Sequence, residues 1–275
     1  FQAEDGIRDS STSRGLGDVY KRQNKTLAIA NQKGGVGKTT TAVNLAASLA
    51  ATNRKTLLID MDPQGNATSA AGVTKNETDT LYATYFEGKN IKDVIKESRD
   101  GYSIVPGGQE LIALDVDIRD NHKQGFLASQ LNEVQNIYDY TIIDTPPTLN
   151  QLTTEALLSS VGTLIPLQCE YYSLEGLTDL INTINALSSK TNTNNRVIGI
   201  IRTMVDMRNN LAKEVSRELE THFEKVLFNT LIPRNVKLAE APSFGISALQ
   251  HKADSFGAMA YLALAGELIR RVENE

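Results

Sequence analysis

The fold of this protein is decided by a ten-residue stretch that reads Asn31-Gln32-Lys33-Gly34-Gly35-Val36-Gly37-Lys38-Thr39-Thr40. An apolar run, Thr26–Ala30, precedes it and predicts a strand, and an amphipathic pattern over Thr40–Ala51 predicts a helix after it. A glycine-rich turn at the start of a helix lets backbone N–H groups surround a phosphate, and the helix dipole adds attraction. The stretch therefore predicts a phosphate-binding loop, or P-loop.

The residues of this loop have separate expected roles. The loop and helix start would contact the nucleotide through Gly34, Gly35, Val36, Gly37, Lys38, Thr39 and Thr40. Lys38 would reach the β- and γ-phosphates, and the Thr39 hydroxyl would bind Mg²⁺. An ordinary glycine-rich turn is the alternative, but Gly-Lys-Thr in register between a strand and a helix favours a nucleotide site.

Three aspartates lie in or directly after predicted strands. Asp60 lies near the end of the run Thr56–Met61, and Asp62 follows that run. These two carboxylates project on the same side of an extended strand. One can position a water while the other supports the metal, although a turn-capping pair is the alternative. The run Tyr140–Ile143 is followed by Asp144, which we expect to hold Mg²⁺ through water.

Strand and helix patterns alternate along the rest of the chain. Further strands are predicted at Tyr102–Val105, Thr163–Leu167, Val197–Ile201 and Val226–Leu231, and further helices at Phe126–Asn136, Leu174–Ser188, Ala212–Phe223 and Ser255–Val272. This alternation predicts an α/β fold, with a mostly parallel sheet that helices cover on both faces. No linker rich in Pro, Gly or Ser divides residues 24–275, which we expect to form a single domain.

Composition limits the classes of protein that fit. Of the 275 residues, 40% are hydrophobic and 22% charged, which is ordinary for a soluble globular protein. A single cysteine, Cys169, excludes an internal disulfide, and no apolar run approaches the roughly 20 residues that cross a bilayer. We therefore expect a cytoplasmic protein. Its charge is uneven, with a net −7 over residues 24–189 and +2 over residues 190–275.

The first 23 residues differ from the rest of the chain. They contain no apolar periodicity and no Met, and they are rich in Gly, Ser, Arg and Asp. The end of this segment, Asp18-Val-Tyr-Lys-Arg-Gln23, resembles the translation of a transposon end used in sequencing libraries. We interpret residues 1–23 as a non-native or disordered tail and exclude them from the fold.

The P-loop departs from the general pattern in one respect. Gln32 stands where the pattern has Gly, and a second lysine, Lys33, follows it. This arrangement resembles the deviant Walker A motif of the ParA/MinD family of P-loop ATPases. The resemblance implies that Lys33 reaches the nucleotide of a second subunit, and that Asp62 is needed for ATP hydrolysis.

Later segments resemble the chromosomal, Soj-type ParA partition proteins in particular. They are Pro166–Leu177 and Ile232–Ser243, and the resemblance covers nearly all of residues 25–272. It implies that Asn235 lies by the adenine, although a helix-capping loop fits that residue equally. The segment Thr203–Leu211 resembles the loop whose arginine contacts DNA in ParA relatives, which implies that Arg208 contacts DNA, with a solvated charge or a pair with Asp206 as the alternative.

The function that this resemblance implies is a slow Mg²⁺-dependent ATPase that positions replicated DNA. Its ATP-bound homodimer would bind DNA without sequence preference on the nucleoid, and a ParB-type centromere-binding protein would stimulate hydrolysis and release. A MinD-like, membrane-recruited ATPase is the main alternative, but the acidic end Val272–Glu275 lacks the basic amphipathic helix this would need. A nitrogenase-type iron protein is excluded because one cysteine cannot hold its cluster, and a metabolic enzyme that activates a carboxylate is a third reading.

Overall fold

The computed structural model describes residues 24–74, 79–121, 124–171, 173–191, 193–206 and 208–273. The expected tail, residues 1–23, lies outside the described residues.

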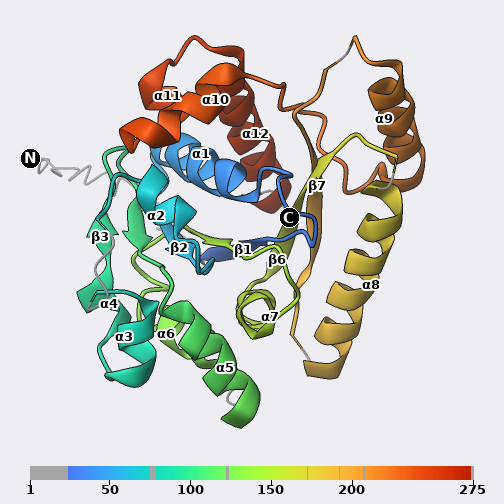
Figure 1. Ribbon diagram of the computed structural model, residues 1–275. Coiled ribbons are helices and arrows are strands. Elements are labelled where there is room, and N and C mark those ends of the chain that lie inside the picture. The colour runs from blue at the N-terminus through green and yellow to red at the C-terminus, as the bar shows by residue number, and fades with distance from the viewer. Residues whose placement is uncertain are drawn as a thin grey trace, which may run out of the picture.

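The described residues form a seven-stranded sheet in the order β3-β4-β2-β5-β1-β6-β7 (Figure 1). The strands are β1 (Lys25–Ile29), β2 (Thr56–Asp60), β3 (Lys96–Glu97), β4 (Ser103–Val105), β5 (Tyr140–Asp144), β6 (Gly162–Gln168) and β7 (Arg196–Thr203). Only β3 runs antiparallel to its neighbour among these strands. The predicted α/β fold with a mostly parallel sheet is therefore confirmed. Because β2, β5 and β1 are adjacent, the segments that carry the three aspartates and the P-loop leave the sheet side by side.

Helices cover both faces of this sheet (Figure 1). One face is covered by α1 (Lys38–Ala51), α2 (Asn66–Ala70), α10 (Val236–Glu240), the 3-10 turn η1 (Ala241–Phe244), α11 (Ala248–His251) and α12 (Phe256–Glu273). The other carries α3 (Leu81–Phe86), α4 (Ile91–Val94), α5 (Leu111–Asn121), α6 (Phe126–Asn132), α7 (Gln151–Leu158), α8 (Ser173–Thr191) and α9 (Asn210–Phe223).

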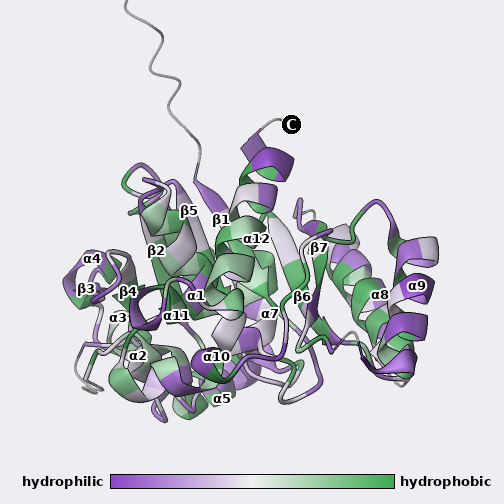
Figure 2. Cartoon of the chain, turned by 90° about the horizontal axis from the view of Figure 1, so that it is seen from above, coloured by the Kyte–Doolittle hydropathy of each residue, from purple (hydrophilic) through white to green (hydrophobic). Residues whose placement is uncertain are grey.

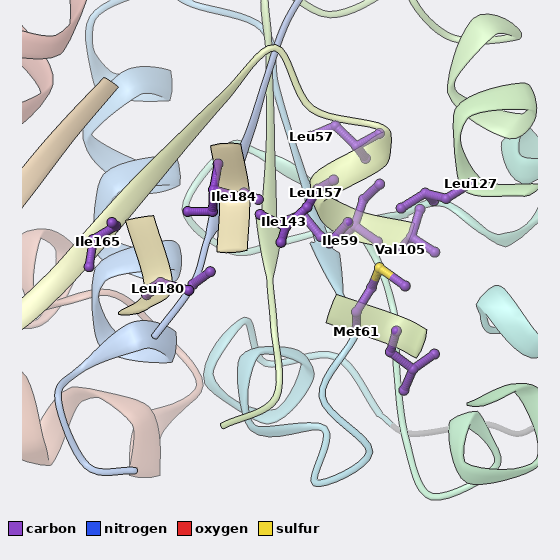
Figure 3. Packing of buried hydrophobic residues seen from close by; sticks show 14 of the residues in the cluster. Leu57, Ile59, Met61, Val105, Leu127, Ile143, Leu157, Ile165, Leu180 and Ile184 are labelled. Carbon is purple, nitrogen blue, oxygen red and sulfur yellow. The ribbon is translucent and has the colours of Figure 1, made fainter. Parts of the chain in front are cut away.

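Two hydrophobic cores result, because successive side chains of a strand point to opposite faces. In β1, Leu27 and Ile29 enter the core under α1 and α12, whereas Ala28 enters the other core. The second core includes Ile59, Ile143 and Leu180, which Figure 3 shows packed between strands and helices. Residues buried on both sides explain why the strands read as continuous apolar runs in the sequence.

At the edge of the sheet, α8 and α9 show alternating hydrophilic and hydrophobic bands (Figure 2). The buried residues of α9 include Ala212, Val215 and Leu219, which are spaced three and four apart. This spacing gives the helix one apolar stripe and one charged face, as the sequence pattern predicts.

Several elements differ from the prediction. The predicted strand Val226–Leu231 is wrong: this segment forms only an isolated bridge from Leu227 to Ile200. Glu267 of α12 accepts the N–H groups of Asn229 and Thr230 at 2.9 Å, so a carboxylate takes the donors that a ladder would use. In addition, α6 ends four residues earlier than predicted, and the two-residue strand β3 was not predicted.

Candidate functional site

The P-loop leaves the end of β1 and leads directly into α1, as predicted. Gly35 and Gly37 have φ angles of 74° and 89°, which L side chains adopt only with strain. Gly34 and Gly35 face open space, since a Cβ added to either would meet no atom within 4 Å. The backbone at this turn is therefore accessible to a ligand.

Side chains from the neighbouring strand ends hold the loop by its carbonyl oxygens. Gln168 Nε2 donates to the Gly35 oxygen, and Thr203 Oγ1 donates to the Val36 oxygen, both at 2.8 Å. Lys38 Nζ lies 3.4 Å from the Lys33 oxygen. None of these three contacts uses a loop N–H group, so they fix the loop without occupying the donors that a phosphate needs.

Lys38 is the buried cation of the site. Only 7% of it is exposed. Burial lowers the pKa of its ammonium group, while the nearby charges of Asp144 and Asp62 act in the opposite direction. The structure therefore brings Lys38 together with two of the three predicted aspartates around one point at the strand ends.

Asp144 is fully buried, and neither of its carboxylate oxygens has a hydrogen-bond partner among the described residues. Burial and then the neighbouring Asp60 raise the pKa of Asp144 well above its usual value, and the positive charge of Lys38 opposes this shift. An unpartnered buried carboxylate of this kind fits a bound cation. Mg²⁺ is held in protein sites by one or two carboxylates together with phosphates and water, and Asp144 is a carboxylate of this kind.

Asp60 and Asp62 have different surroundings, although they are two residues apart. Asp60 is fully buried and accepts hydrogen bonds from the Asp62 N–H and from both donors of Thr68. Burial raises its pKa to about 6, and those hydrogen bonds oppose the shift. The Asp62 carboxylate accepts only the Gln64 N–H, through Oδ1 at 2.9 Å, among the described residues. Asp62 is therefore the member of the pair that can still accept a hydrogen bond from a water.

The comparisons with known proteins agree with this geometry. A family model described as an AAA domain matches residues 24–198. The chromosome partitioning protein ParA of Myxococcus xanthus is 44% identical over 250 residues, 90% of this chain and 88% of that protein. The sporulation initiation inhibitor protein Soj of Bacillus subtilis is 41% identical over 247 residues, 89% of this chain and 98% of that protein. The chain belongs to the ParA/MinD family of P-loop ATPases.

This ParA/MinD-family chain also resembles a solved structure with ligands bound. Cobyrinic acid a,c-diamide synthase from Mycobacterium smegmatis, with bound ATP analog and magnesium, is 27% identical, with a TM-score of 0.78 over 91% of this chain and 96% of that one. ATP and Mg²⁺ are accordingly the cofactors of the family site. No helix of the described residues is long and apolar enough to cross a membrane.

A pocket of about 390 Å³ adjoins the P-loop of this ParA/MinD-family chain on the side of α10 and α12. It is lined by Gly37, Thr40, Thr203, Met204, Ile232, Pro233, Arg234, Asn235, Val236, Leu238, Ala239 and Tyr261. Asn235 also caps α10, because its Oδ1 accepts the Lys237 N–H at 2.9 Å. Both alternatives for Asn235 therefore have a basis in the structure: it caps a helix, and it faces a mostly apolar pocket of the kind that holds a base.

Lys33 and Arg208 lie outside the buried part of the site. The Lys33 side chain is 45% exposed and forms an ion pair with Glu170, which is 52% exposed. The Arg208 side chain is 91% exposed and donates from Nε and NH2 to the carboxylate of Asp206, at 2.9 and 2.7 Å. Their roles toward a second subunit and toward DNA stay predictions.

Several residues of the site were not predicted from the sequence. Glu170, Gln168 and Thr203 contact the P-loop from strand ends more than 130 residues away. Thr68, which binds Asp60, lies in the short helix α2, whose amino-acid sequence gives no sign that Thr68 is buried. A partial signal existed for Gln168 and Glu170, which stand in a segment that resembles the partition proteins.

Proposed function

We propose that this ParA/MinD-family chain is a partitioning ATPase that acts as an ATP-driven switch. In its ATP form it dimerises with the nucleotides between the subunits, and the dimer binds DNA without sequence preference. A ParB-type centromere-binding partner stimulates slow hydrolysis and releases the DNA. The two relatives named ParA and Soj support this class over a metabolic enzyme, because they are 44% and 41% identical and the synthase only 27%.

The observation that carries the proposal is the position of the second P-loop lysine. Lys38 occupies the buried place beside Asp62 and Asp144, whereas Lys33 is half-exposed on the outside. Its ion pair with Glu170 lies in water, where such pairs contribute little. Lys33 can therefore exchange Glu170 for the more concentrated negative charge of a nucleotide that a second subunit presents.

The buried residues supply what nucleotide binding and hydrolysis require of one chain. Lys38 balances the phosphate charge, and the loop N–H groups orient the phosphates. Asp144 and Thr39 would hold Mg²⁺, which when bound neutralises phosphate charge. Asp62 would orient the attacking water through its available oxygen. Asn235 and the apolar pocket would hold the adenine.

Arg208 is the residue that we expect to contact DNA. It lies in the last third of the chain, residues 190–275, which carries net positive charge, and its guanidinium projects into solvent on the loop before α9. A DNA phosphate would replace Asp206 as its partner, which requires no base recognition. A protein that binds DNA in this way would lie in the cytoplasm, on the nucleoid.

An acidic groove between α8 and α9 is the surface that we assign to the stimulating partner. It measures about 470 Å³ and is lined by Tyr171, Leu174, Glu175, Leu211, Glu214, Val215 and Glu218. Tyr171 directly follows Glu170, the partner of Lys33. A basic segment with apolar side chains would complement the acidic and apolar side chains of this lining.

Co-sedimentation with ATP tests the proposal against its alternatives. We expect the protein to pellet with duplex DNA, and not with anionic lipid vesicles, only when ATP and Mg²⁺ are present. The Lys33→Ala variant should lose this binding together with the ATP-dependent dimer seen by size-exclusion chromatography. Binding to vesicles but not to DNA would instead support a MinD-like ATPase.

A matched experiment addresses the groove. Glu175→Lys and Glu214→Lys should weaken stimulation of the ATPase by the cognate ParB-type protein about tenfold and leave the basal rate unchanged. Glu224→Lys, on the exposed end of α9, provides the charge control. Full stimulation of both groove variants would remove this surface from the proposal.

A further inference from the structure

A buried hydrogen-bond network connects the segment of Asp62 to two other parts of the fold. Asp60 Oδ1 accepts the Asp62 N–H at 3.2 Å. Asp60 Oδ2 accepts the Thr68 N–H at 2.8 Å and the Thr68 hydroxyl at 2.7 Å. The Thr68 hydroxyl in turn accepts the Gly107 N–H at 2.9 Å. The network therefore joins the end of β2, helix α2 and the segment after β4.

The Thr68 hydroxyl has one proton and two oxygens within reach. The Gly107 carbonyl lies 3.2 Å away, whereas Asp60 Oδ2 lies 2.7 Å away and carries charge. The proton therefore goes to Asp60, which leaves the hydroxyl lone pairs to accept from Gly107. Both Thr68 and Asp60 are fully buried, so water cannot replace either bond.

Gly107 is held against β2 by close backbone contact. A Cβ at this position would lie 2.1 Å from the Asp60 carbonyl oxygen, so only glycine fits. Thr68 thus binds the Asp60 carboxylate and the Gly107 backbone, which belong to two segments in close contact. It has no room to move away without leaving buried polar groups unpaired.

The same residues close a ring around Asp62. The Asp62 N–H binds Asp60, its Oδ1 accepts the Gln64 N–H, and its carbonyl accepts the Gly65 N–H at 2.8 Å. Gly65 is the N-cap of α2, and Thr68 of α2 donates back to Asp60. Each part of this ring limits the positions that the Asp62 carboxylate can take.

We propose that Thr68 is a positioning residue for ATP hydrolysis, which fixes α2 onto Asp60 and so sets the Asp62 carboxylate toward the attacking water. This inference rests on the proposed role of Asp62. Thr68 itself touches neither the P-loop nor Asp144 in the described hydrogen bonds, so it acts on the rate of reaction and not on nucleotide affinity.

The Thr68→Val variant tests this inference, because valine keeps the shape of threonine and removes only its hydroxyl. We expect kcat for ATP to fall about 10-fold to 100-fold, the range that misplacing a reacting group by about 1 Å produces. KM for ATP and the ATP-dependent dimer should change less than about threefold, because Lys38, Thr39 and Asp144 are untouched. Thr68→Ser, which keeps the hydroxyl, should restore most of kcat.

Thr84→Val provides the matched control. Thr84 is also a buried helical threonine, but among the described residues its hydroxyl binds only the Leu81 carbonyl of α3, away from the site. It should lower the melting temperature to a comparable degree without changing kcat. If Thr68→Val does not fold, Thr68→Cys replaces it and should show a smaller loss of kcat, because a thiol is a weak donor.

Several results would overturn the inference. They are an unchanged kcat in Thr68→Val, a loss that Thr68→Ser does not restore, or equal changes in kcat and KM. An Asp62→Ala control separates this from failure of the proposed function. If Asp62→Ala hydrolyses ATP normally, the role of Asp62 is wrong and the inference fails with it. If Asp62→Ala is inactive and Thr68→Val is normal, the positioning role of Thr68 alone is wrong.

Discussion

The buried and exposed halves of the site hold their charges in different ways. Lys38, Asp62 and Asp144 are at most 7% exposed, and the oxygens of Asp144 have no hydrogen-bond partner in the described structure. Lys33 and Arg208 are 45% and 91% exposed at their side chains, and each is paired with a carboxylate of its own chain. Buried charges without partners require a ligand, whereas solvated pairs exchange partners at little cost. One half is thus suited to hold a nucleotide and the other to respond to a second molecule.

Lys38→Ala should have the largest effect, because it removes the one buried cation of the phosphate site. We expect ATP affinity to fall at least about 100-fold, since each 1.4 kcal/mol of lost binding is tenfold. Titration with a fluorescent ATP analogue measures this. Lys33→Ala, which alters the exposed half, is the control and should retain most of the affinity. A dissociation constant for Lys38→Ala within threefold of the wild type would contradict the assignment.

Asp62→Ala should separate binding from hydrolysis within the buried half. The variant should bind ATP and dimerise, because Lys38 and Asp144 remain, but it should not turn over. Size-exclusion chromatography with ATP and Mg²⁺, together with phosphate release, tests both points. Asp93→Ala, in the first turn of α4, is a distant carboxylate control. An Asp62→Ala protein that stays monomeric would rule out the assigned role.

Lys33→Ala should keep ATP binding and lose ATP-dependent dimerisation and stimulated hydrolysis, because its proposed target is the partner's phosphates. Mixed dimers sharpen the test. A Lys33→Ala subunit is paired with an Asp62→Ala subunit, and ATP turnover is compared with that of each homodimer. Action across the interface predicts a different activity in the mixture, and equal activities would leave it unsupported.

Arg208→Ala should have a smaller effect, confined to DNA. We expect basal hydrolysis and dimerisation to persist, while binding to non-specific duplex DNA at about 0.1 M salt is lost and the salt dependence falls by about one unit of slope per lost phosphate contact. Asp206→Asn releases Arg208 from its carboxylate and should strengthen DNA binding. Wild-type affinity and slope in Arg208→Ala would direct attention to Lys213, Arg217 and Lys237.

Deletion of residues 1–23 should have the smallest effect, since nothing in their sequence is patterned to pack. The melting temperature and ATP affinity should stay at wild-type values. Differential scanning calorimetry and the same fluorescent titration measure both. A fall of several degrees in the melting temperature would show that the segment belongs to the fold.

The sequence predicted those parts of the site whose residues are close in the chain. The P-loop and the aspartates at strand ends follow from local pattern and from the rule that parallel strands end at one edge. The contacts of Thr68 with Gly107, and of Gln168 and Thr203 with the P-loop, depend on segments 39 to 167 residues apart. The wrong strand at Val226–Leu231 has the same cause, because Glu267 of α12 takes its backbone donors. The local sequence pattern does not indicate which distant group will accept a given backbone N–H.

The side chains that bind the P-loop carbonyl oxygens affect how fast the protein can bind and release nucleotide repeatedly. Gln168 and Thr203 fix the Gly35 and Val36 peptide planes from strand ends that belong to the rigid sheet. The conformational entropy of this turn is therefore lost when the protein folds and not each time a nucleotide enters. A P-loop that keeps its conformation between nucleotides can release one and bind the next without a slow ordering step. The duration of each cycle of binding and hydrolysis is then set by the hydrolysis step and by the exposed contacts.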